Sequence, residues 1–186
     1  MGAYGGVTGA NRARIEGILT ELGMTPAHPR LATLVAFDEA TDLVPTLCHV
    51  TGEELLLAPA ASSAWTGLVQ AGAADGIILE LISGFRSYNY QRDLIRKKQE
   101  AGRSLDDILR SVAPPGFSEH HTGEAVDVGS PGCDDLTASF AACAAFPWLT
   151  ENARKFGWTL SYPEGNNFGY VYEPWHWKWN PEKITP

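Results

Sequence analysis

Apolar residues recur along this chain with two spacings, and each spacing predicts a different element. Runs with apolar residues at every third or fourth position, or rich in Ala and Leu, predict helices, whereas compact or alternating apolar runs predict strands. The predicted helices lie at residues 11–22, 53–74, 88–103, 104–112 and 148–156. The predicted strands lie at residues 77–82, 124–128, 158–162 and 170–172. Helices come first and short strands follow, which is the pattern of an α+β domain.

Individual residues set several of the boundaries. Asn11 is predicted to cap the first helix and Gly23 to end it, and Gly157 is predicted to end the last helix. Residues 31–38 form a short apolar run that fits either a helix or a strand. Residues 129–147 are predicted to be a loop with a helical middle.

Size and charge narrow the classes of function. The chain has 186 residues, of which 44% are hydrophobic, so we expect one domain with an ordinary buried core and at most a helical appendage. The formal net charge of -8 argues against a nucleic-acid-binding surface and against attraction to anionic membranes. No apolar run approaches the ~20 residues of a membrane-spanning helix.

The start of the chain and its cysteines bear on the compartment. Residues 1–6 lack the basic region and apolar region of a secretory signal, so the protein is either cytoplasmic or exported by a signal absent from this sequence. Three cysteines, Cys48, Cys133 and Cys143, cannot all pair with one another. We favour three unbridged thiols. A bridge between Cys133 and Cys143, which flank a short segment, is the alternative in an oxidising compartment.

Two separate segments carry the residues with the most specific chemistry. His120 and Asp127 lie in the first segment, and Glu173 and His176 lie in the second, near the end of the chain. Two imidazoles and one carboxylate leave the fourth position of a tetrahedral zinc open, as in catalytic sites. Glu173, three residues before His176, is placed to handle the proton of a metal-bound water.

Three motifs in a fixed order strengthen this interpretation. Residues 83–87 read Ser-Gly-Phe-Arg-Ser and are followed by Gln91. Residues 118–127 carry the pattern Ser-x-His-x-x-Gly-x-Ala-x-Asp, and residues 173–176 read Glu-Pro-Trp-His. These motifs resemble those of the VanY-type zinc D-alanyl-D-alanine carboxypeptidases, a branch of the superfamily that also holds lysostaphin-like peptidases and the hedgehog domain. The family commonly has tyrosine where Phe85 stands, a mild departure.

The resemblance, which spans about residues 50–180, implies a fold and a metal centre. The fold is a small antiparallel sheet that carries the site and packs with helices. One zinc ion is bound by His120, Asp127 and His176. Glu173 is the general base that takes a proton from the zinc-bound water as that water attacks the scissile carbonyl. Both histidines should find an acceptor for their other ring nitrogen.

The resemblance also implies residues that meet the substrate. Arg86 faces the developing oxyanion, with a structural ion pair as the alternative. Gln91 and Ser118 hydrogen-bond the substrate, although Ser118 could instead serve a local turn. Tyr162 is a candidate for the pocket wall by its position alone.

Three polar neighbours of these residues receive plainer interpretations. His121 competes with His120 for the metal, but adjacent residues on an extended segment point to opposite sides, so His121 is assigned a rim or packing role. Glu119 and Glu124 lie beside the metal motif in sequence. Both are expected to be solvated.

The expected activity is removal of the C-terminal D-alanine from peptidoglycan stem peptides. An L,D-carboxypeptidase, an endolysin-like stem-peptide endopeptidase and a non-catalytic hedgehog-like zinc module are the alternatives. Glu173 and Arg86 favour an enzyme, because a binding module needs neither. We expect a monomeric protein in the periplasm or at the cell wall, with a cytoplasmic hydrolase of small dipeptides as another possibility. Residues 1–40 are assigned to an N-terminal tail and helical extension, and residues 41–186 to the catalytic domain.

Overall fold

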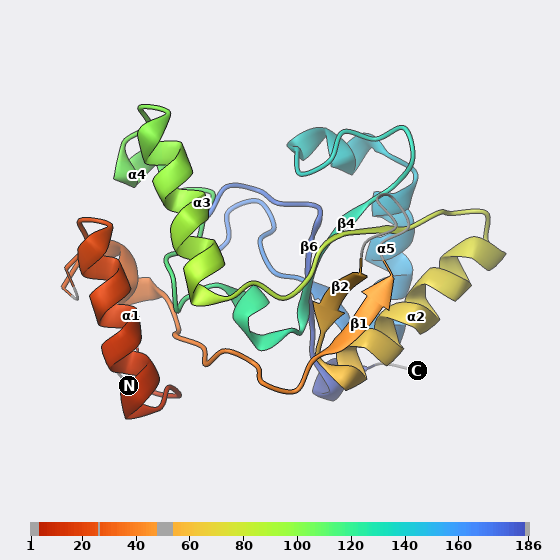
Figure 1. Ribbon diagram of the computed structural model, residues 1–186. Helices are drawn as coiled ribbons and strands as arrows, with labels where there is room; N and C mark the ends of the chain where they lie inside the picture. The colour runs from red at the N-terminus through yellow and green to blue at the C-terminus, as the bar shows by residue number, and fades with distance from the viewer. Residues whose placement is uncertain (1–3, 26, 48–53, 185–186) are drawn as a thin grey trace.

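The structure, a computed structural model, describes residues 4–25, 27–47 and 54–184. Helices gather on one side of the molecule and the strands lie beside further helices on the other (Figure 1). Within the described residues the α-helices are α1 (Gly9–Glu21), α2 (Pro59–Ala74), α3 (Tyr88–Glu100), α4 (Leu105–Ile108) and α5 (Ala145–Asn152). The strands are β1 (Val44–Leu47), β2 (Glu54–Leu57), β3 (Glu80–Ser83), β4 (Ala125–Gly129), β5 (Trp158–Leu160) and β6 (His176–Trp179). Short 3₁₀ helices include η1 (Pro29–Thr33), η2 (Glu119–Thr122), η3 (Ala138–Ala142), η4 (Ala153–Phe156) and η5 (Pro181–Lys183).

The main sheet is antiparallel and has four strands in the order β3-β4-β6-β5. Its register places Asp127 of β4 opposite Ser83 of β3 and His176 of β6. All residues of β4 are buried. Because side chains alternate along a strand, Val126 and Val128 enter the hydrophobic core while Asp127 faces the other way. This arrangement confirms the predicted α+β fold with a small antiparallel sheet.

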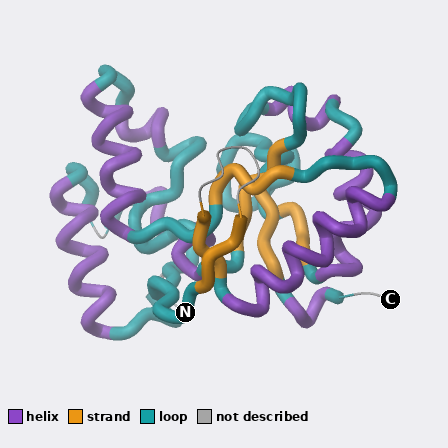
Figure 2. The backbone as a smooth tube through the Cα atoms, turned by 45° about the vertical axis from the view of Figure 1, so that its right-hand side comes forward, coloured by secondary structure: helices purple, strands orange, loops and turns teal. Residues whose placement is uncertain are grey.

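A hydrophobic core lies between the main sheet and the helices α2 and α5, and we call this half the sheet side. Its buried residues include Leu68 of α2, Val126 of β4, Leu149 of α5, Trp158 of β5 and Trp177 of β6. Figure 2 shows helices beside the strands on this side of the molecule. The tryptophans of this region therefore serve mainly as core.

A second core lies on the other side of the molecule, which we call the helical side. It joins Ile15 and Leu19 of α1 to Ile95 of α3 and Ile108 of α4. Phe117, just before η2, is buried in the same cluster. Helix α1 therefore shares a core with elements of the predicted catalytic domain, while the boundary assigned near residue 40 stays a prediction.

One predicted helix starts too early, and one predicted strand is wrong. Residues 54–57, expected to begin a helix, form strand β2 and pair with β1. The helix begins only at Pro59, whose ring suits the first helical position and not the interior. Residues 170–172, expected to be a strand, are irregular, because Val171 donates its N–H to the loop carbonyl of Arg110. The neighbour of β5 is β6.

Smaller corrections concern helix ends and the ambiguous segment. Thr8, and not Asn11, caps α1, because its side chain accepts the N–H of Asn11. Gly23 follows the helix with a φ of 80°, as expected of a terminating glycine. The run at residues 31–38 begins within the 3₁₀ helix η1 and continues without regular structure. Gly157, with a φ of 83°, ends η4 as predicted.

The loop after β4 is closed by a disulfide bond between Cys133 and Cys143. The favoured expectation of unbridged thiols is therefore wrong for these two residues, because the loop folds back far enough to bring them together. Cys48 lies outside the described residues. Among the described residues, no helix is both long enough and apolar enough to cross a membrane.

Candidate metal centre

Three elements bring His120, Asp127 and His176 together. Asp127 and His176 are directly paired across β4 and β6. His120 lies on η2, which Ser118 caps by accepting the His120 N–H. Gly123 ends η2 with a φ of 67°, where an added Cβ would come within 2.7 Å of Leu43 and 2.9 Å of the Ala58 nitrogen. This motif glycine is therefore required both for its conformation and for its close contacts.

The ligand atoms of the three residues lie within 4.8 Å of one another, and all three residues are buried. His120 Nε2 is 3.3 Å from Asp127 Oδ1, and His176 Nδ1 is 3.1 Å from the same oxygen. A tetrahedral metal with bonds of about 2.0–2.1 Å holds its ligand atoms about 3.3 Å apart. The geometry therefore fits one small divalent ion between these atoms.

The hydrogen bonds of His120 support this fit. Its Nδ1–H donates to the Gly84 carbonyl at 2.7 Å, which leaves Nε2 to face Asp127. Among the described residues, Nε2 is buried without a hydrogen-bond partner. Burial, followed by the nearby charge of Arg86, lowers the pKa of His120 to about 4, so the ring is neutral at physiological pH. A neutral imidazole with a bare, buried nitrogen suits metal binding.

The charges around His176 also favour a cation. Burial alone would raise the pKa of Asp127, but the neighbouring His120 and Arg86 hold it well below its usual range. Burial alone would lower the pKa of His176, but hydrogen bonds to Asp127 and Glu119 raise it to about 10. Two imidazoles and a carboxylate match the ligands that catalytic zinc takes in proteins, so the residues fit that ion.

Glu173 lies beside the three ligand residues and has a different environment. Its Oε2 is 4.0 Å from His176 Nδ1, and its backbone N–H donates to the Tyr162 carbonyl at 3.0 Å. The residue is 7% exposed. Burial raises the pKa of Glu173 to about 7. A carboxyl group with a pKa near neutrality can both accept and return a proton at working pH.

Arg86 pairs with a ligand residue in this structure. One guanidinium nitrogen, Nη2, donates to Asp127 Oδ2, and Nε donates to Ser83 Oγ at 2.9 Å. The guanidinium also lines the cavity that contains the ligand residues. Arg86 therefore forms the structural ion pair that the sequence analysis gave as its alternative role, and it also lies at the site. Its contact with an oxyanion stays a prediction.

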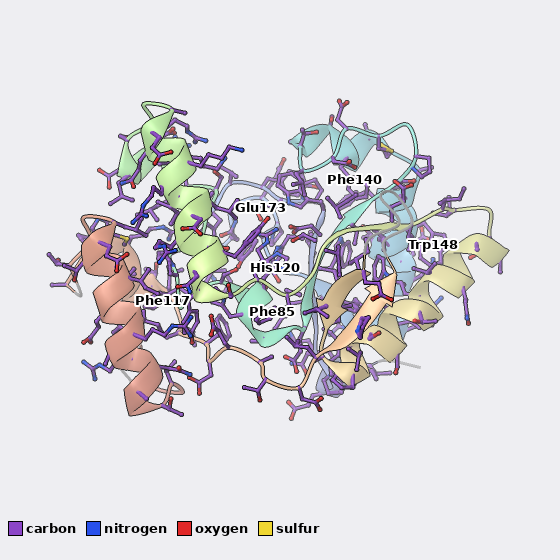
Figure 3. All side chains as sticks on the ribbon, viewed as in Figure 1. Phe85, Phe117, His120, Phe140, Trp148 and Glu173 are labelled. Carbon is purple, nitrogen blue, oxygen red and sulfur yellow. A yellow bond between two sulfur atoms is a disulfide. The ribbon has the colours of Figure 1, made fainter. Side chains whose placement is uncertain are left out.

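A cavity of about 680 Å³ opens over the ligand residues and Glu173. Gln91 of α3, Ser118 and Tyr162 all line it, as do residues 111–113, 136–138 and 170–172. Figure 3 shows His120 and Glu173 between the helical side and the sheet side. The candidate substrate-binding residues are thus at one cavity, and their contacts with a substrate stay a prediction.

Gln91 has a free hydrogen-bonding atom in this cavity wall. Its Nε2 donates to the Ala113 carbonyl at 2.9 Å. Its Oε1 is buried without a partner among the described residues, and the residue is only 1% exposed. Tyr162 packs its ring at 4.6 Å from the ring of His176. Gln91 can therefore accept a hydrogen bond, and Tyr162 supports a ligand ring.

Two interpretations of the neighbouring polar residues need correction. His120 and His121 lie on a 3₁₀ helix and not on an extended segment, and both are buried. His121 donates from Nδ1 to the Arg86 carbonyl at 2.6 Å and accepts the Gly116 N–H at Nε2, so its role is in packing, as expected. Glu119 is not solvated. Its Oε2 lies 2.9 Å from His176 Nε2.

Glu124 and Ser161 also form polar contacts close to the candidate metal centre. Glu124 is half-buried and pairs with Lys178 at 2.6 Å. Ser161 Oγ donates to Glu119 Oε2 at 2.6 Å. Sequence reasoning missed the contact between Ser161 and Glu119, because it joins the residue after β5 to η2 and no spacing in the chain indicates it.

Comparison with known proteins agrees with the geometry. The family model VanY, D-alanyl-D-alanine carboxypeptidase, matches residues 54–182. YodJ of Bacillus subtilis (strain 168) is 32% identical over 128 residues, which make up 67% of this chain and 46% of that protein. The chain thus spans about half the length of YodJ.

Solved structures share the fold. The LdcB LD-carboxypeptidase matches with a TM-score of 0.70 and 30% identity over 81% of this chain and 76% of that chain. The D,D-pentapeptidase VanY in complex with Zn(II) matches with a TM-score of 0.59 and 26% identity over 75% of this chain and 79% of that one. VanYB in complex with D-alanine-D-alanine matches with a TM-score of 0.61 and 25% identity over 78% and 81%. The chain belongs to the VanY D-alanyl-D-alanine carboxypeptidase family.

Proposed function

We propose that this chain is a zinc carboxypeptidase that removes the C-terminal D-alanine from peptidoglycan stem peptides. The observation that carries the proposal is the buried cluster of His120, Asp127 and His176 with Glu173 beside it in one cavity. Membership of the VanY family and the Zn(II) bound by a related VanY support the choice of metal. One zinc ion per chain is held by the three clustered residues.

Zinc bound by these three residues would supply Lewis acidity and a lowered pKa for water. Glu173 is the general base that removes a proton from the attacking water and then delivers a proton to the leaving amine. Its raised pKa, about 7, suits both tasks near neutral pH. His120 and Asp127 stay in the unprotonated forms that bind metal, because the pKa of each is lowered.

The cavity wall supplies the groups that place the peptide. Arg86 presents a fixed positive charge toward the carbonyl oxygen on which charge develops, and Asp127 holds the guanidinium there. Gln91 Oε1 accepts an N–H of the peptide, because its amide nitrogen is already used by the Ala113 carbonyl. Ser118 and Tyr162 complete the wall beside the ligand residues.

A second candidate activity is that of an L,D-carboxypeptidase, which removes D-alanine from a tetrapeptide. The observation in its favour is the likeness to the LdcB LD-carboxypeptidase, whose TM-score of 0.70 and identity of 30% exceed those of the VanY structure at 0.59 and 26%. The three ligand residues and Glu173 serve either reaction, since both hydrolyse an amide bond to D-alanine. The choice between them depends on the cavity wall.

The same proposal places the protein outside the cytoplasm as a monomer acting on cell-wall peptide. The Cys133–Cys143 disulfide supports this location, because such bonds persist in oxidising compartments.

Turnover of two synthetic stem peptides tests the proposal. The zinc-loaded chain should release D-alanine from a pentapeptide ending in D-Ala-D-Ala, as followed by mass spectrometry. Glu173→Gln should retain one zinc and lose about 10²–10⁴-fold in kcat. Glu164→Gln, in an exposed turn nearby, is the matched control and should be unchanged. Cleavage of the tetrapeptide alone would reject the D,D assignment in favour of the L,D one. Full turnover by Glu173→Gln would reject the general-base role.

A further inference from the structure

We propose that Glu119 is a positioning residue that orients His176 toward the metal, an inference that rests on the proposed zinc site. Glu119 Oε2 is 2.9 Å from His176 Nε2, on the opposite side of the ring from Nδ1. Nδ1 is the nitrogen that faces Asp127, at 3.1 Å. The carboxylate therefore accepts the Nε2–H and leaves Nδ1 as the metal-binding atom.

Glu119 is itself held in place. It lies on η2 next to His120, and its side chain is 16% exposed. Ser161 Oγ donates to the same Oε2 at 2.6 Å, which fixes the carboxylate at the end of β5. A carboxylate fixed in this way restrains rotation of the imidazole and makes its metal-binding nitrogen more basic.

The two ligand histidines are thus oriented by different means. His120 is held by a backbone carbonyl, that of Gly84, which no side-chain substitution removes. His176 is held by a charged side chain, which a single substitution removes. The orientation of His176 can therefore be tested without altering a ligand.

The position of Glu119 also separates it from the substrate. It lines a different cavity, of about 620 Å³, together with Ser161, Glu124 and Lys178. It does not line the cavity that holds Glu173 and Arg86. A substrate in that cavity meets His176 and not Glu119, so the effect of Glu119 must pass through the ligand.

Zinc affinity measured by competition with a chromophoric chelator tests this role. Glu119→Ala should weaken zinc binding about 10–100-fold, as loss of an outer partner of a ligand histidine commonly does. Glu119→Gln keeps the size of the side chain and should fall between Glu119→Ala and wild type, which covers the case that the alanine variant fails to fold. Excess zinc should restore much of the turnover of either variant.

Glu124→Gln is the matched control. It removes a carboxylate of the same cavity that pairs with Lys178, and among the described residues no ion pair joins it to His120, Asp127 or His176. Its zinc affinity should stay within about twofold of wild type, because half-exposed ion pairs contribute little. Wild-type zinc affinity in both Glu119 variants would overturn the role of Glu119 alone, whereas a wild-type chain that binds no zinc would overturn the proposed function as well.

A separate set of contacts leads to a second inference. We infer that Arg30, which lies before the residues 54–182 that match the family model, holds the cavity wall formed by residues 170–172. Its Nη1 donates to the Phe168 carbonyl and its Nε donates to the Leu109 carbonyl at 3.2 Å. Its guanidinium carbon lies 4.2 Å from the centre of the Tyr170 ring.

The ring contacts continue from Arg30 to the metal centre. Tyr170 lies 4.7 Å from Tyr162 between ring centres, and Tyr162 lies 4.6 Å from the His176 ring. Both tyrosines line the cavity over the ligand residues. Arg30 therefore fixes, from the N-terminal segment, a wall that the substrate would contact.

Hydrogen–deuterium exchange and kinetics test this second inference. Arg30→Ala should speed amide exchange at Phe168, Tyr170 and Val171, and raise KM about 2–30-fold for the stem peptide that the wild type cleaves, with zinc affinity unchanged. Arg12→Ala is the control, because Arg12 lies over Tyr4 at 4.9 Å, on α1. Exchange in Arg30→Ala equal to that in Arg12→Ala would overturn the inference, whatever the kinetics. Faster exchange without a rise in KM would overturn the link to substrate.

Discussion

The sheet side and the helical side contribute differently to the candidate site. The sheet side supplies Asp127 and His176 from two paired central strands, and these strands lie over a core rich in tryptophan. The helical side supplies Gln91, and its core includes Tyr162 and Tyr170 of the cavity wall. The metal-binding atoms therefore depend chiefly on strand register, whereas the wall depends on packing between helices and loops. We expect changes on the sheet side to affect the metal and changes on the helical side to affect the substrate.

The largest expected effect is on the sheet side, at Asp127. Asp127→Ala removes a ligand and leaves the Arg86 guanidinium, which is largely buried, without its partner. Loss of a hydrogen-bond partner of a metal ligand typically weakens metal binding about 10–100-fold. Loss of Asp127 itself should weaken zinc binding by more than this, and turnover should be lost as well. Zinc content after dialysis, measured by atomic absorption, checks this. Retention of a full equivalent of zinc would contradict the assigned ligand set.

A smaller effect is expected at Arg86, where the two sides meet. Arg86→Ala should lower kcat about 10²–10³-fold if the guanidinium stabilises an oxyanion. Parallel measurement of zinc affinity separates this role from the ion pair with Asp127. A loss of zinc affinity that accounts for the whole fall in turnover would instead support the structural ion pair.

Matched core truncations compare the two sides directly. Leu149 of α5 and Ile15 of α1 are both 0% exposed, and each belongs to a different core. Leu149→Ala and Ile15→Ala should each lower the free energy of unfolding by about 2–5 kcal/mol, measured by urea denaturation. A loss well below about 1 kcal/mol for Ile15→Ala alone would show that α1 is a loosely attached extension, in keeping with the boundary predicted near residue 40.

The smallest expected effect concerns Tyr88, on the helical side. Its hydroxyl donates to the Phe37 carbonyl at 2.6 Å, and burial raises its pKa to about 12. Because the folded pKa lies above the usual value of about 10, the stabilisation is complete below pH 10 and is lost as the pH rises toward 12.

Thermal unfolding of wild type and Tyr88→Phe across that pH range checks the sign. The wild type should lose about 1 kcal/mol more than the variant between pH 10 and pH 12. Parallel pH profiles for the two proteins would contradict the assignment.

Sequence reasoning selected the three residues that the structure brings together as a candidate metal centre, because their signal is local. His120 and Asp127 lie in one short motif, and Glu173 and His176 lie in another, so the resemblance of these motifs to those of a known family could select them. Strands β3, β4 and β5 overlap predicted strands, and β4 was placed to within a residue, whereas β6 lies outside the predicted ranges. These features depend on neighbours in the chain.

The errors arose where distant contacts decide the outcome. Strand β2 forms because β1 pairs with it, although its residues also suit a helix. Glu119 turns inward because His176 and Ser161, far along the chain, both donate hydrogen bonds to its carboxylate. The bridge between Cys133 and Cys143 depends on how the loop folds back. The spacing of apolar and polar residues along the chain does not indicate these distant contacts.

The direct pairing of Asp127 with His176 has a consequence for how such a chain can diverge. A slip of one residue would turn Asp127 into the core and Val126 into the cavity, so the alignment of these two strands tolerates no error. The largely exposed loop at residues 130–137, which supplies Leu136 and Thr137 to the cavity wall, is under less constraint. Such a loop can lengthen, shorten or be exchanged during evolution, and new substrate preferences can arise while the candidate metal-binding residues stay in place.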